Sequence, residues 1–457
     1  MKDYKEAVKY LDGFINYEKR LERVIYNQRT FDLESFHTFL KTLGNPQDQF
    51  PCLHIAGTKG KGSVAAMLEG ALLEANLRIG LYTSPHIESY LERIRTNGTE
   101  ITEERFTRYL DFLRKRIEEK QPEPPRRYRT VFELLTAMAF LFFRDENLDL
   151  AILETGLGGR LDATNVVKPV LCIITTLGLE HTNLLGDTLS GIAREKGGIV
   201  KEGVPVVLSK QESPGDREIL PVIESICREK KAPLVFAEER VEILRRDILQ
   251  AGGTNPHQIS QRILFGFKDG SEREVDLPLA GKHQLENCRT VLTALEILCK
   301  TGMVPDMERA IRGIGKTKWP GRFEILKGEP TAILDGAHCP LSARALSRTL
   351  EEYFPERRRI LAIGVMKGKN ASEIARELGK DPLLSEVIAF PPPSPRGLAG
   401  EELAAHFREV FPGVKAAPSL ESALETAVEG VKPGDVLVVA GSIYNIAPAR
   451  QVLTRGL

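Results

Sequence analysis

The chain has 457 residues, 42% of them hydrophobic and 28% charged, a composition typical of a globular protein with two or three domains. Lys plus Arg and Asp plus Glu both total 63, so the charge balance excludes a general attraction to nucleic acid or to an anionic membrane. Six cysteines without a C-x-x-C pair, a charged N-terminus and no apolar run of about 18 residues predict a cytoplasmic protein without a membrane span.

Short apolar runs alternate with helical patterns through the first half of the chain. We expect strands at 52–56, 79–82, 150–153, 171–175 and 205–209. Helices are expected at 63–75 and 132–143. This alternation predicts an α/β fold with a P-loop NTPase-like, mostly parallel sheet that carries helices on both faces.

The second half of the chain begins with a change of pattern. Residues 234–280 contain short β-like segments between turns, which predict a small β patch within a first domain spanning 1–315. The Lys-Thr-Lys-Trp-Pro-Gly segment at 316–321 then breaks the pattern and marks a domain boundary. A smaller, Rossmann-like α/β domain is expected over 320–457, with strands at 331–334, 360–365, 386–390 and 436–440.

A glycine-rich loop directly follows the first expected strand. Gly57, Gly60 and Gly62 let the backbone approach an anion closely, and the following helix adds the positive end of its dipole. Lys61 can reach a terminal phosphate, and Ser63 can meet a phosphate or a magnesium ion. The loop is a variant of the usual phosphate-binding pattern, and a glycine turn without a ligand is the alternative interpretation.

Polar side chains also follow the other early strands. Ligands bind outside the carboxyl ends of the strands of an open parallel sheet, so Ser84, Glu154 and His181 are expected beside the glycine loop. One carboxylate, one hydroxyl and phosphate oxygens form a usual shell for Mg²⁺. The alternatives are that Glu154 caps the next turn, that His181 packs or faces solvent, and that Ser84 belongs only to a Ser-Pro turn.

Further polar residues stand at element ends. Asp162 follows a second glycine-rich loop and is expected to cap a helix. Lys196 lies at a helix end, where favourable contact with the helix dipole is the simplest interpretation. Residues 282–287 open a helix with polar groups that could face a nucleotide, and Asp335 and His338 follow a strand of the second domain.

Together these motifs resemble the folylpolyglutamate synthase/dihydrofolate synthase family, within the Mur-ligase-like ATP-dependent amide ligases. The most specific parts are the glycine loop, Ser-Pro-His, Gly-Leu-Gly-Gly-Arg-Leu-Asp-Ala-Thr-Asn and Asp-Gly-Ala-His. The matching segments cover nearly the whole chain in the expected order: 54–63, 81–86, 92–94, 130–133, 152–166, 178–181, 185–186, 195–199, 281–287, 320–324 and 335–340.

The resemblance implies roles that spacing leaves open. It implies ATP binding by Gly57, Thr58, Gly60, Lys61, Gly62, Ser63, Asn287, Arg322 and Asp335. It implies two Mg²⁺ ions, with Ser84, Glu154, His181 and a carbamylated Lys196 as ligands. A pterin pocket is implied at Thr130, Val131, Phe132, Glu133, Leu161, Asp162 and Ala163, and a glutamate site at Ser84 and His338. Lys61, Lys196 and His338 are the residues expected to act in the reaction.

The implied reaction is ATP-dependent addition of L-glutamate to a folate, and also to dihydropteroate, through an acyl phosphate with release of ADP and phosphate. The protein is expected to be a monomer without nucleic acid or membrane partners. Lys59 stands where the family usually has asparagine, and Cys339 replaces the asparagine after Asp-Gly-Ala-His. Residues 32–35 only partly resemble the early pterin-contact segment, which weakens the case for dihydropteroate.

Two other functions fit parts of the pattern. A Mur-type ligase acting on a UDP-linked muramyl precursor is disfavoured because the glycine loop begins by residue 57, which leaves no room for a UDP-binding domain. A P-loop regulatory ATPase would use the same loop to drive motion. ATP hydrolysis that strictly requires both a folate and L-glutamate would separate the ligase from this regulatory class.

Overall fold

The computed structural model describes residues 1–17, 26–28, 30–119, 129–249, 260–326, 328 and 330–455. The chain divides into two compact units. Unit 1 comprises Met1–Arg245, Leu264–Val275 and Glu286–Thr317, and unit 2 comprises Arg246–Ile263, Asp276–Leu285 and Lys318–Leu457. Within these described ranges, no helix has the length and apolar character needed to cross a bilayer.

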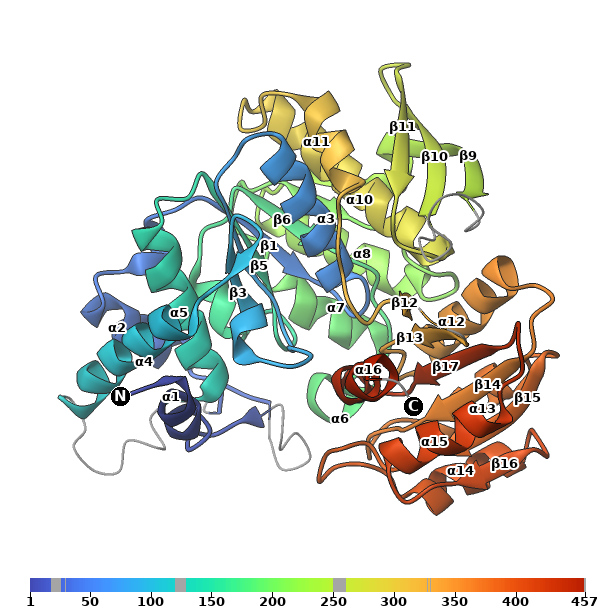
Figure 1. Ribbon diagram of the computed structural model, residues 1–457. Helices are drawn as coiled ribbons and strands as arrows, with labels where there is room; N and C mark the ends of the chain where they lie inside the picture. Colours follow the sequence, from blue (N-terminus) through green and yellow to red (C-terminus); the bar gives the residue numbers. More distant parts are fainter. Residues whose placement is uncertain are drawn as a thin grey trace. The chain divides into compact units, whose positions relative to one another are not determined.

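Unit 1 is built on an eight-stranded sheet in the order β4-β3-β2-β5-β1-β6-β7-β8 (Figure 1). The strands are β1 Cys52–Ala56, β2 Ile79–Tyr82, β3 Ile94–Thr96, β4 Thr99–Glu100, β5 Leu150–Glu154, β6 Leu171–Ile174, β7 Val206–Leu208 and β8 Leu234–Phe236. From β2 to β8 all neighbours pair in parallel, whereas β3 and β4 form an antiparallel edge. The mostly parallel sheet predicted from the sequence is confirmed, with β1 at its centre between β5 and β6.

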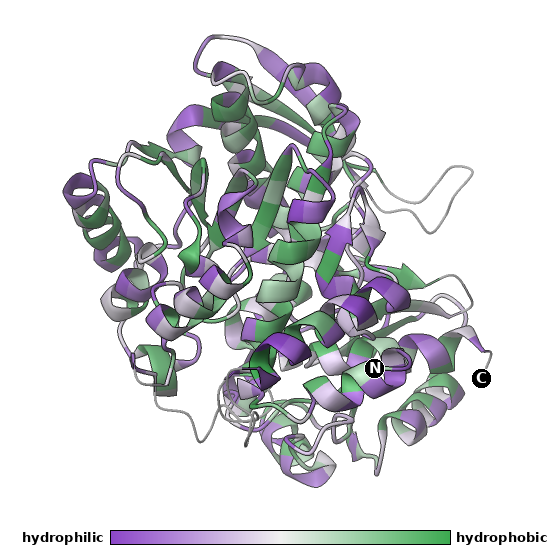
Figure 2. Cartoon of the chain, turned by 90° about the vertical axis from the view of Figure 1, so that its left-hand side faces the viewer, coloured by the Kyte–Doolittle hydropathy of each residue, from purple (hydrophilic) through white to green (hydrophobic). Residues whose placement is uncertain are grey.

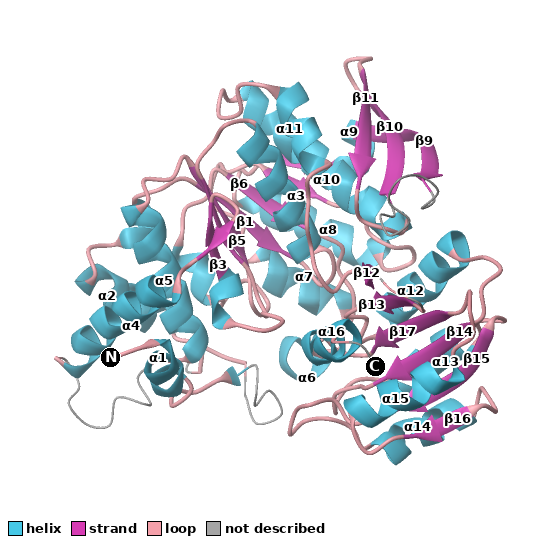
Figure 3. Ribbon diagram, viewed as in Figure 1, coloured by secondary structure: helices cyan, strands magenta, loops and turns pink. Residues whose placement is uncertain are grey.

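Helices cover both faces of this sheet, and α5 and α3 lie on opposite sides of it (Figures 1 and 3). The α-helices of unit 1 are α1 Tyr4–Leu11, α2 Leu33–Thr42, α3 Lys61–Glu74, α4 Glu103–Glu118, α5 Val131–Asp145, α6 Thr182–Leu185, α7 Leu189–Gly197, α8 Asp216–Glu229, α9 Ala237–Arg240, α10 Lys282–Lys300 (which begins in unit 2) and α11 Met307–Ile314. Short 3-10 turns lie at Pro46–Asp48, Tyr90–Arg93 and Ala163–Val166. Hydrophobic residues are concentrated in the strands and on the helix faces beside them (Figure 2).

Helix α3, which starts at the glycine loop, is fixed by close packing at its middle. A Cβ atom on Gly70 would lie only 2.7 Å from the carbonyl oxygen of Gly313 in α11, so only glycine permits this approach. The structure begins α3 at Lys61, two positions earlier than the predicted helix 63–75. The earlier start brings Lys61 and Gly62 into the first helical turn.

Unit 2 contains a six-stranded sheet in the order β12-β13-β17-β14-β15-β16. Its strands are β12 Glu324–Leu326, β13 Thr331–Leu334, β14 Arg359–Ile363, β15 Leu384–Ala389, β16 Val414–Ala416 and β17 Val436–Ala440, and only β12 is antiparallel to its neighbour. The helices are α12 Pro340–Tyr353, α13 Ala371–Gly379, α14 Gly400–Arg408, α15 Leu420–Gly430 and α16 Ile446–Thr454, with a 3-10 turn at Ile443–Asn445. The second, smaller α/β fold expected from the sequence is confirmed.

A three-stranded sheet in the order β11-β10-β9 occupies the region where the small β patch was predicted. It comprises β9 Val241–Leu249, β10 Ser260–Phe267 and β11 Glu272–Leu277. Parts of all three strands belong to unit 2, and the remaining parts belong to unit 1. The last division between the units falls between Thr317 and Lys318, inside the segment that breaks the sequence pattern.

Candidate active site

The phosphate loop of unit 1 joins β1 to α3. Gly60 is the N-cap of α3 with a φ of 90°, in the left-handed region that glycine adopts without strain. A Cβ atom at Gly60 would lie 2.4 Å from Oδ1 of Asn287, so this predicted ATP contact on α10 lies directly against the loop. The first four N–H groups of a helix lack partners within the helix, and at α3 they come from the glycine loop. The loop therefore has the geometry of an anion site.

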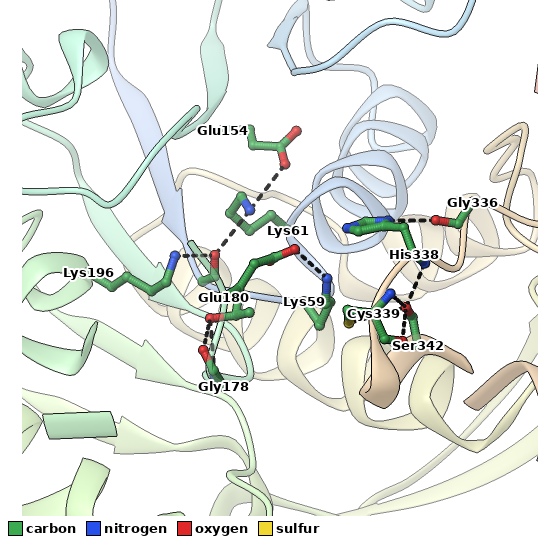
Figure 4. Close-up of polar contacts among 12 residues, drawn as sticks. Lys59, Lys61, Glu154, Gly178, Glu180, Lys196, Gly336, His338, Cys339 and Ser342 are labelled. Carbon is green, nitrogen blue, oxygen red and sulfur yellow. Dashed lines mark hydrogen bonds and ion pairs between the residues drawn. The ribbon is translucent and has the colours of Figure 1, made fainter. Parts of the chain in front are cut away.

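Two lysines share one carbonyl of this loop. The Nζ atoms of Lys61 and Lys196 donate to the carbonyl oxygen of Gly57 at 3.1 and 2.8 Å (Figure 4). A side chain at Gly57 is excluded, because its Cβ would lie 1.7 Å from Oγ1 of Thr175. The loop thus brings together two amino groups from elements far apart in the sequence.

Lys196 lies in the last turn of α7, but its amino group is buried and does not act as an exposed cap of the helix. Burial, followed by the positive charge of Lys61, lowers the pKa of Lys196 to about 7. A lysine with this pKa is substantially unprotonated near neutral pH. Its amine is then a nucleophile, because the nitrogen lone pair is available.

A carboxylate from β5, the strand beside β1, faces Lys61. Glu154 ends β5 and is 4% exposed, and its Oε1 lies 3.9 Å from Nζ of Lys61. The backbone N–H of Ser84, just after β2, donates to Oε2 of Glu154 at 3.2 Å. Because β2, β5 and β1 are parallel neighbours, their carboxyl ends place Ser84, Glu154 and the phosphate loop at one edge of the sheet.

This donor set suits a hard divalent cation. Glu154 supplies carboxylate oxygens and Ser84 a hydroxyl, which are ligand types that Mg²⁺ prefers. Within the described part of the chain, no three His, Cys, Asp or Glu side chains gather as a metal cluster. Besides Glu154 and Ser84, a magnesium ion at this edge would take oxygen ligands from phosphate and water, as Mg²⁺ commonly does.

The loop after β6 is fastened to the phosphate loop. Oγ1 of Thr58 donates to the carbonyl oxygen of Gly178 and accepts from its N–H, both at 3.1 Å. Nζ of Lys59 pairs with Oε1 of Glu180 at 3.0 Å (Figure 4). His181 follows as the N-cap of α6 with a left-handed φ of 52°. The predicted ligand His181 thus lies directly after a loop that is hydrogen-bonded and ion-paired to the phosphate loop.

The segment predicted to contact the pterin begins α5 with a reciprocal cap. The N–H of Glu133 donates to Oγ1 of Thr130 at 3.1 Å, and the N–H of Thr130 donates to Oε2 of Glu133 at 2.7 Å. The Phe132 ring lies so close to Gly156 that a Cβ there would be 2.6 Å from Cζ of the ring. This contact joins the start of α5 to the second glycine loop, the two segments predicted to form the pocket.

Asp162 organises the second glycine loop. It caps the 3-10 turn Ala163–Val166 by accepting from the N–H of Thr164, which confirms the predicted cap. Its Oδ2 also accepts from the N–H groups of Gly156 and Leu157, each at 2.9 Å. Oγ1 of Thr164 donates to Oδ1 of Asp162 at 2.6 Å and contacts Nε2 of His54 at 2.8 Å. Burial raises the pKa of Asp162, against the opposing effect of these hydrogen bonds.

Three predicted residues of unit 2 lie around β13. Oδ2 and Oδ1 of Asp335 accept from the N–H groups of Phe323 and Ala337, each at 2.8 Å. Burial raises the pKa of Asp335, and the Arg322 guanidinium opposes that shift. Nδ1 of His338 lies 2.7 Å from the carbonyl oxygen of Gly336 (Figure 4). A carbonyl can only accept, so Nδ1 carries a proton.

Sequence reasoning missed two polar links at this site. Lys59 stood out only as a departure from the family, and Glu180 only as the neighbour of His181, whereas the structure pairs them. His54 was part of the motif but had no assigned role, and its contact with Thr164 spans 110 positions. For the first link, the sequence offers only the opposite charges of Lys59 and Glu180. For the second, it offers a histidine inside an apolar strand, where a buried polar group needs a partner.

The two units define a class of protein: an ATP-dependent ligase of the Mur type, with a nucleotide loop in the first unit and a smaller α/β second unit. The Mur ligase middle domain model matches residues 55–295, and the Mur ligase, glutamate ligase domain model matches residues 321–443. Relatives at least 30% identical that align over nearly the whole chain show that it belongs to the folylpolyglutamate synthase/dihydrofolate synthase family.

Individual relatives cover nearly the whole chain. The dihydrofolate synthase/folylpolyglutamate synthase of Bacillus subtilis (strain 168) is 32% identical, over 90% of this chain and 92% of the relative. The solved folylpolyglutamate synthase of Mycobacterium tuberculosis, complexed with ADP, is 28% identical with a TM-score of 0.85 and 98% of each chain covered. A folylpolyglutamate synthase solved as a complex with AMPPCP and folate is 27% identical with a TM-score of 0.82 and 99% of each chain covered.

Proposed function

We propose that this chain catalyses ATP-dependent addition of L-glutamate to a folate. The observation that carries the proposal is the set of contacts among Lys61, Glu154 and Ser84 at the carboxyl ends of three neighbouring strands. The solved relative that holds AMPPCP and folate supports a nucleotide and a folate as substrates. We extend the proposal to dihydropteroate as a second acceptor, which the name of the Bacillus subtilis relative supports.

The chemistry follows from the poor reactivity of a carboxylate. Its leaving group would be oxide, so the folate carboxylate first takes the γ-phosphoryl group of ATP and becomes an acyl phosphate. The amine of glutamate then attacks the carbonyl carbon, the C–O bond to phosphate breaks, and the amine loses a proton. The products are the amide, ADP and phosphate.

The phosphate loop would stabilise the charge that spreads over the transferring phosphoryl group. The N–H groups at the start of α3 and the ammonium group of Lys61 supply fixed positive charge at that position. Two bound Mg²⁺ ions would screen the phosphate charges and polarise the phosphoryl oxygens. We propose Ser84 and Glu154 as ligands of one ion and His181 as a ligand of the other.

We propose that Lys196 is carbamylated. Its unprotonated, neutral amine attacks the carbon of CO₂. A new N–C bond forms as one C–O π bond breaks, and the nitrogen releases one proton, which leaves an anion with oxygen donors. The pKa of about 7 supports this step, because burial and the Lys61 charge leave much of the amine unprotonated at neutral pH. Nearby Lys61 and Lys59 would then stabilise the carbamate anion.

The remaining assignments follow the family pattern. Asn287, Arg322 and Asp335 are proposed ATP contacts, and His338 a proposed glutamate contact. We also propose that the protein works in a reducing compartment such as the cytoplasm. All six cysteines lie within the described ranges, and each of them is a free thiol.

ADP release tests the function directly. We expect release only when ATP, L-glutamate and an acceptor are all present, with tetrahydrofolate and dihydropteroate assayed in parallel as acceptors. Lys61→Ala and Glu154→Ala should each lower turnover by at least about a hundredfold, by analogy with the loss of one group that stabilises a transition state, while circular dichroism stays unchanged. ATP hydrolysis that needs neither acceptor nor glutamate would instead indicate a regulatory ATPase.

The carbamate has a separate test. Lys196→Ala should be inactive, and short carboxylic acids should partly restore turnover by placing a carboxylate where the carbamate would lie. ¹³CO₂ NMR should give a carbamate signal in the native enzyme and not in the variant. Full activity of Lys196→Ala without added acid, or the absence of a carbamate signal from the native enzyme, would contradict carbamylation.

A further inference from the structure

Three kinds of contact join the phosphate loop to the loop that carries His181. The N–H groups of Thr58 and Lys59 donate to the carbonyl oxygen of Thr176 at 3.0 and 3.1 Å. The Thr58 hydroxyl exchanges two hydrogen bonds with the backbone of Gly178. The third contact is ionic, between Lys59 and Glu180 at 3.0 Å, and it joins residues 121 positions apart. The ionic contact lies closest to His181.

His181 needs such support because its backbone conformation is unfavourable. It has a φ of 52° and a ψ of 39°, a left-handed conformation that a residue with a Cβ rarely adopts. Residues held in this region persist only when their surroundings impose the conformation. On its C-terminal side, the carbonyl oxygen of His181 accepts from the N–H groups of Leu184 and Leu185. On its N-terminal side, the adjacent residue Glu180 is tied to the phosphate loop by its ion pair with Lys59.

We propose that Lys59 is a positioning residue that, through Glu180, holds His181 in the conformation needed to bind a divalent cation together with the phosphates of ATP. This inference rests on the proposed function, in which His181 is a ligand of the second cation. The Lys59 side chain is 25% exposed and that of Glu180 12%, so the pair is partly shielded from solvent. An ion pair of this kind contributes modestly, and its loss shifts a binding constant by a few fold.

The sign of the effect separates this role from simple electrostatics. Lys59 carries a positive charge, so Coulomb's law alone predicts that its removal tightens the binding of a nearby cation. The positioning role predicts the reverse, since His181 loses its restraint. If Lys59 instead contacted phosphate directly, changing Lys59 would weaken nucleotide binding, whereas neutralising Glu180 would leave nucleotide binding unchanged.

Mn²⁺ binding measured by electron paramagnetic resonance, with the full chain saturated by AMPPCP, tests the proposal without turnover. Lys59→Met keeps the aliphatic stem and removes the charge, and Glu180→Gln keeps the shape of the carboxylate. We expect each variant to bind the second Mn²⁺ ion roughly two- to fivefold more weakly than the native protein. The double variant should bind it no more weakly than either single variant. Lys59→Arg, which keeps the charge, should retain the native affinity.

Lys316→Met is a matched control. Lys316 pairs with Glu74 at 2.6 Å, at the other end of α3 and about 20 Å along the helix axis from the loop. We expect it to leave Mn²⁺ binding unchanged. Unaltered or tighter binding of the second ion in Lys59→Met would overturn the positioning role. If the native enzyme itself binds only one Mn²⁺ ion, the proposed second cation site is wrong, and this result is distinguishable from failure of the positioning role alone.

Discussion

His54 lies in the strand that leads into the phosphate loop, and its imidazole contacts Thr164, which directly follows the residues 161–163 predicted to bind the pterin. Thr164 donates its hydroxyl proton to Asp162, so the Thr164 oxygen must accept from His54, whose Nε2 therefore carries the proton. The ring is fully buried, and burial, followed by the positive charge of Lys201, lowers the pKa of His54 to about 3. A neutral His54 thus joins β1 to the second glycine loop.

This burial makes stability depend on pH. The unfolded histidine titrates near 6.5 and the folded one near 3, so between these values the unfolded chain binds more protons and the folded state weakens as the pH falls. One such group contributes a slope of up to about 1.4 kcal/mol per pH unit. His54→Gln, whose amide can still donate to Thr164, should show a shallower loss of unfolding free energy in urea titrations at pH 7, 6 and 5. Equal slopes in both proteins would contradict the assignment.

Single residues were predictable from the sequence where a local motif carries the chemistry. The glycines of the phosphate loop and Glu154 at a strand end are of this kind. Lys196 was not, because spacing alone indicated a helix-capping lysine, whereas its contact with Gly57 joins positions 139 apart. The Lys59–Glu180 pair was missed for the same reason. Such contacts depend on the order of strands in the sheet, which local pattern does not encode.

At the scale of elements, the central strands of the two large sheets were predicted closely, whereas the edge strands β4, β8 and β12 were missed. β1, β2 and β5 are buried along their whole length, so they appear in the sequence as continuous apolar runs. β4 is exposed, and β8 and β12 are half-buried, so their hydrophobic signal is weak. These three strands are also only two or three residues long, which is below what periodicity can detect.

The junction of β1 and α3 yields a prediction about glycine. Gly60→Ala should impair nucleotide binding, because its Cβ meets Asn287 and because alanine is strained at a φ of 90°. Gly302→Ala is a matched control, since Gly302 has a φ of 77° and nothing within 4 Å of its Cβ position. Both variants should lose stability, by about 1 kcal/mol in the control, but only Gly60→Ala should raise the KM for ATP. An unchanged KM would show that Asn287 moves aside without cost.

At the scale of the whole molecule, the chain passes between the two units more than once. A Pro-Gly motif in the sequence marks the boundary near residue 317. No comparable motif indicates that Arg246–Ile263 and Asp276–Leu285 belong to unit 2. These segments join unit 2 through side chains. Nη2 of Arg246 donates to Oε2 of Glu352 in α12, and Nε of Arg246 donates to Oε1 of Gln261 in β10, both at 2.7 Å. Gln261 in turn donates to the carbonyl oxygens of Leu279 and Gly281.

Arg246→Ala should therefore weaken unit 2 selectively. The Arg246 side chain is 14% exposed, and its removal leaves Glu352 and Gln261 without these charge-assisted bonds, a loss of about 1–3 kcal/mol. Hydrogen exchange followed by mass spectrometry should show lost protection in β13 and α12 and unchanged protection in β1 and α3. Arg262→Ala removes an exposed pair with Asp276 in the same sheet and should have an effect of at most about 1 kcal/mol. Equal loss of protection in β1 and β13 after Arg246→Ala would mean that the two units unfold as one, because local weakening of unit 2 leaves the strands of unit 1 hydrogen-bonded.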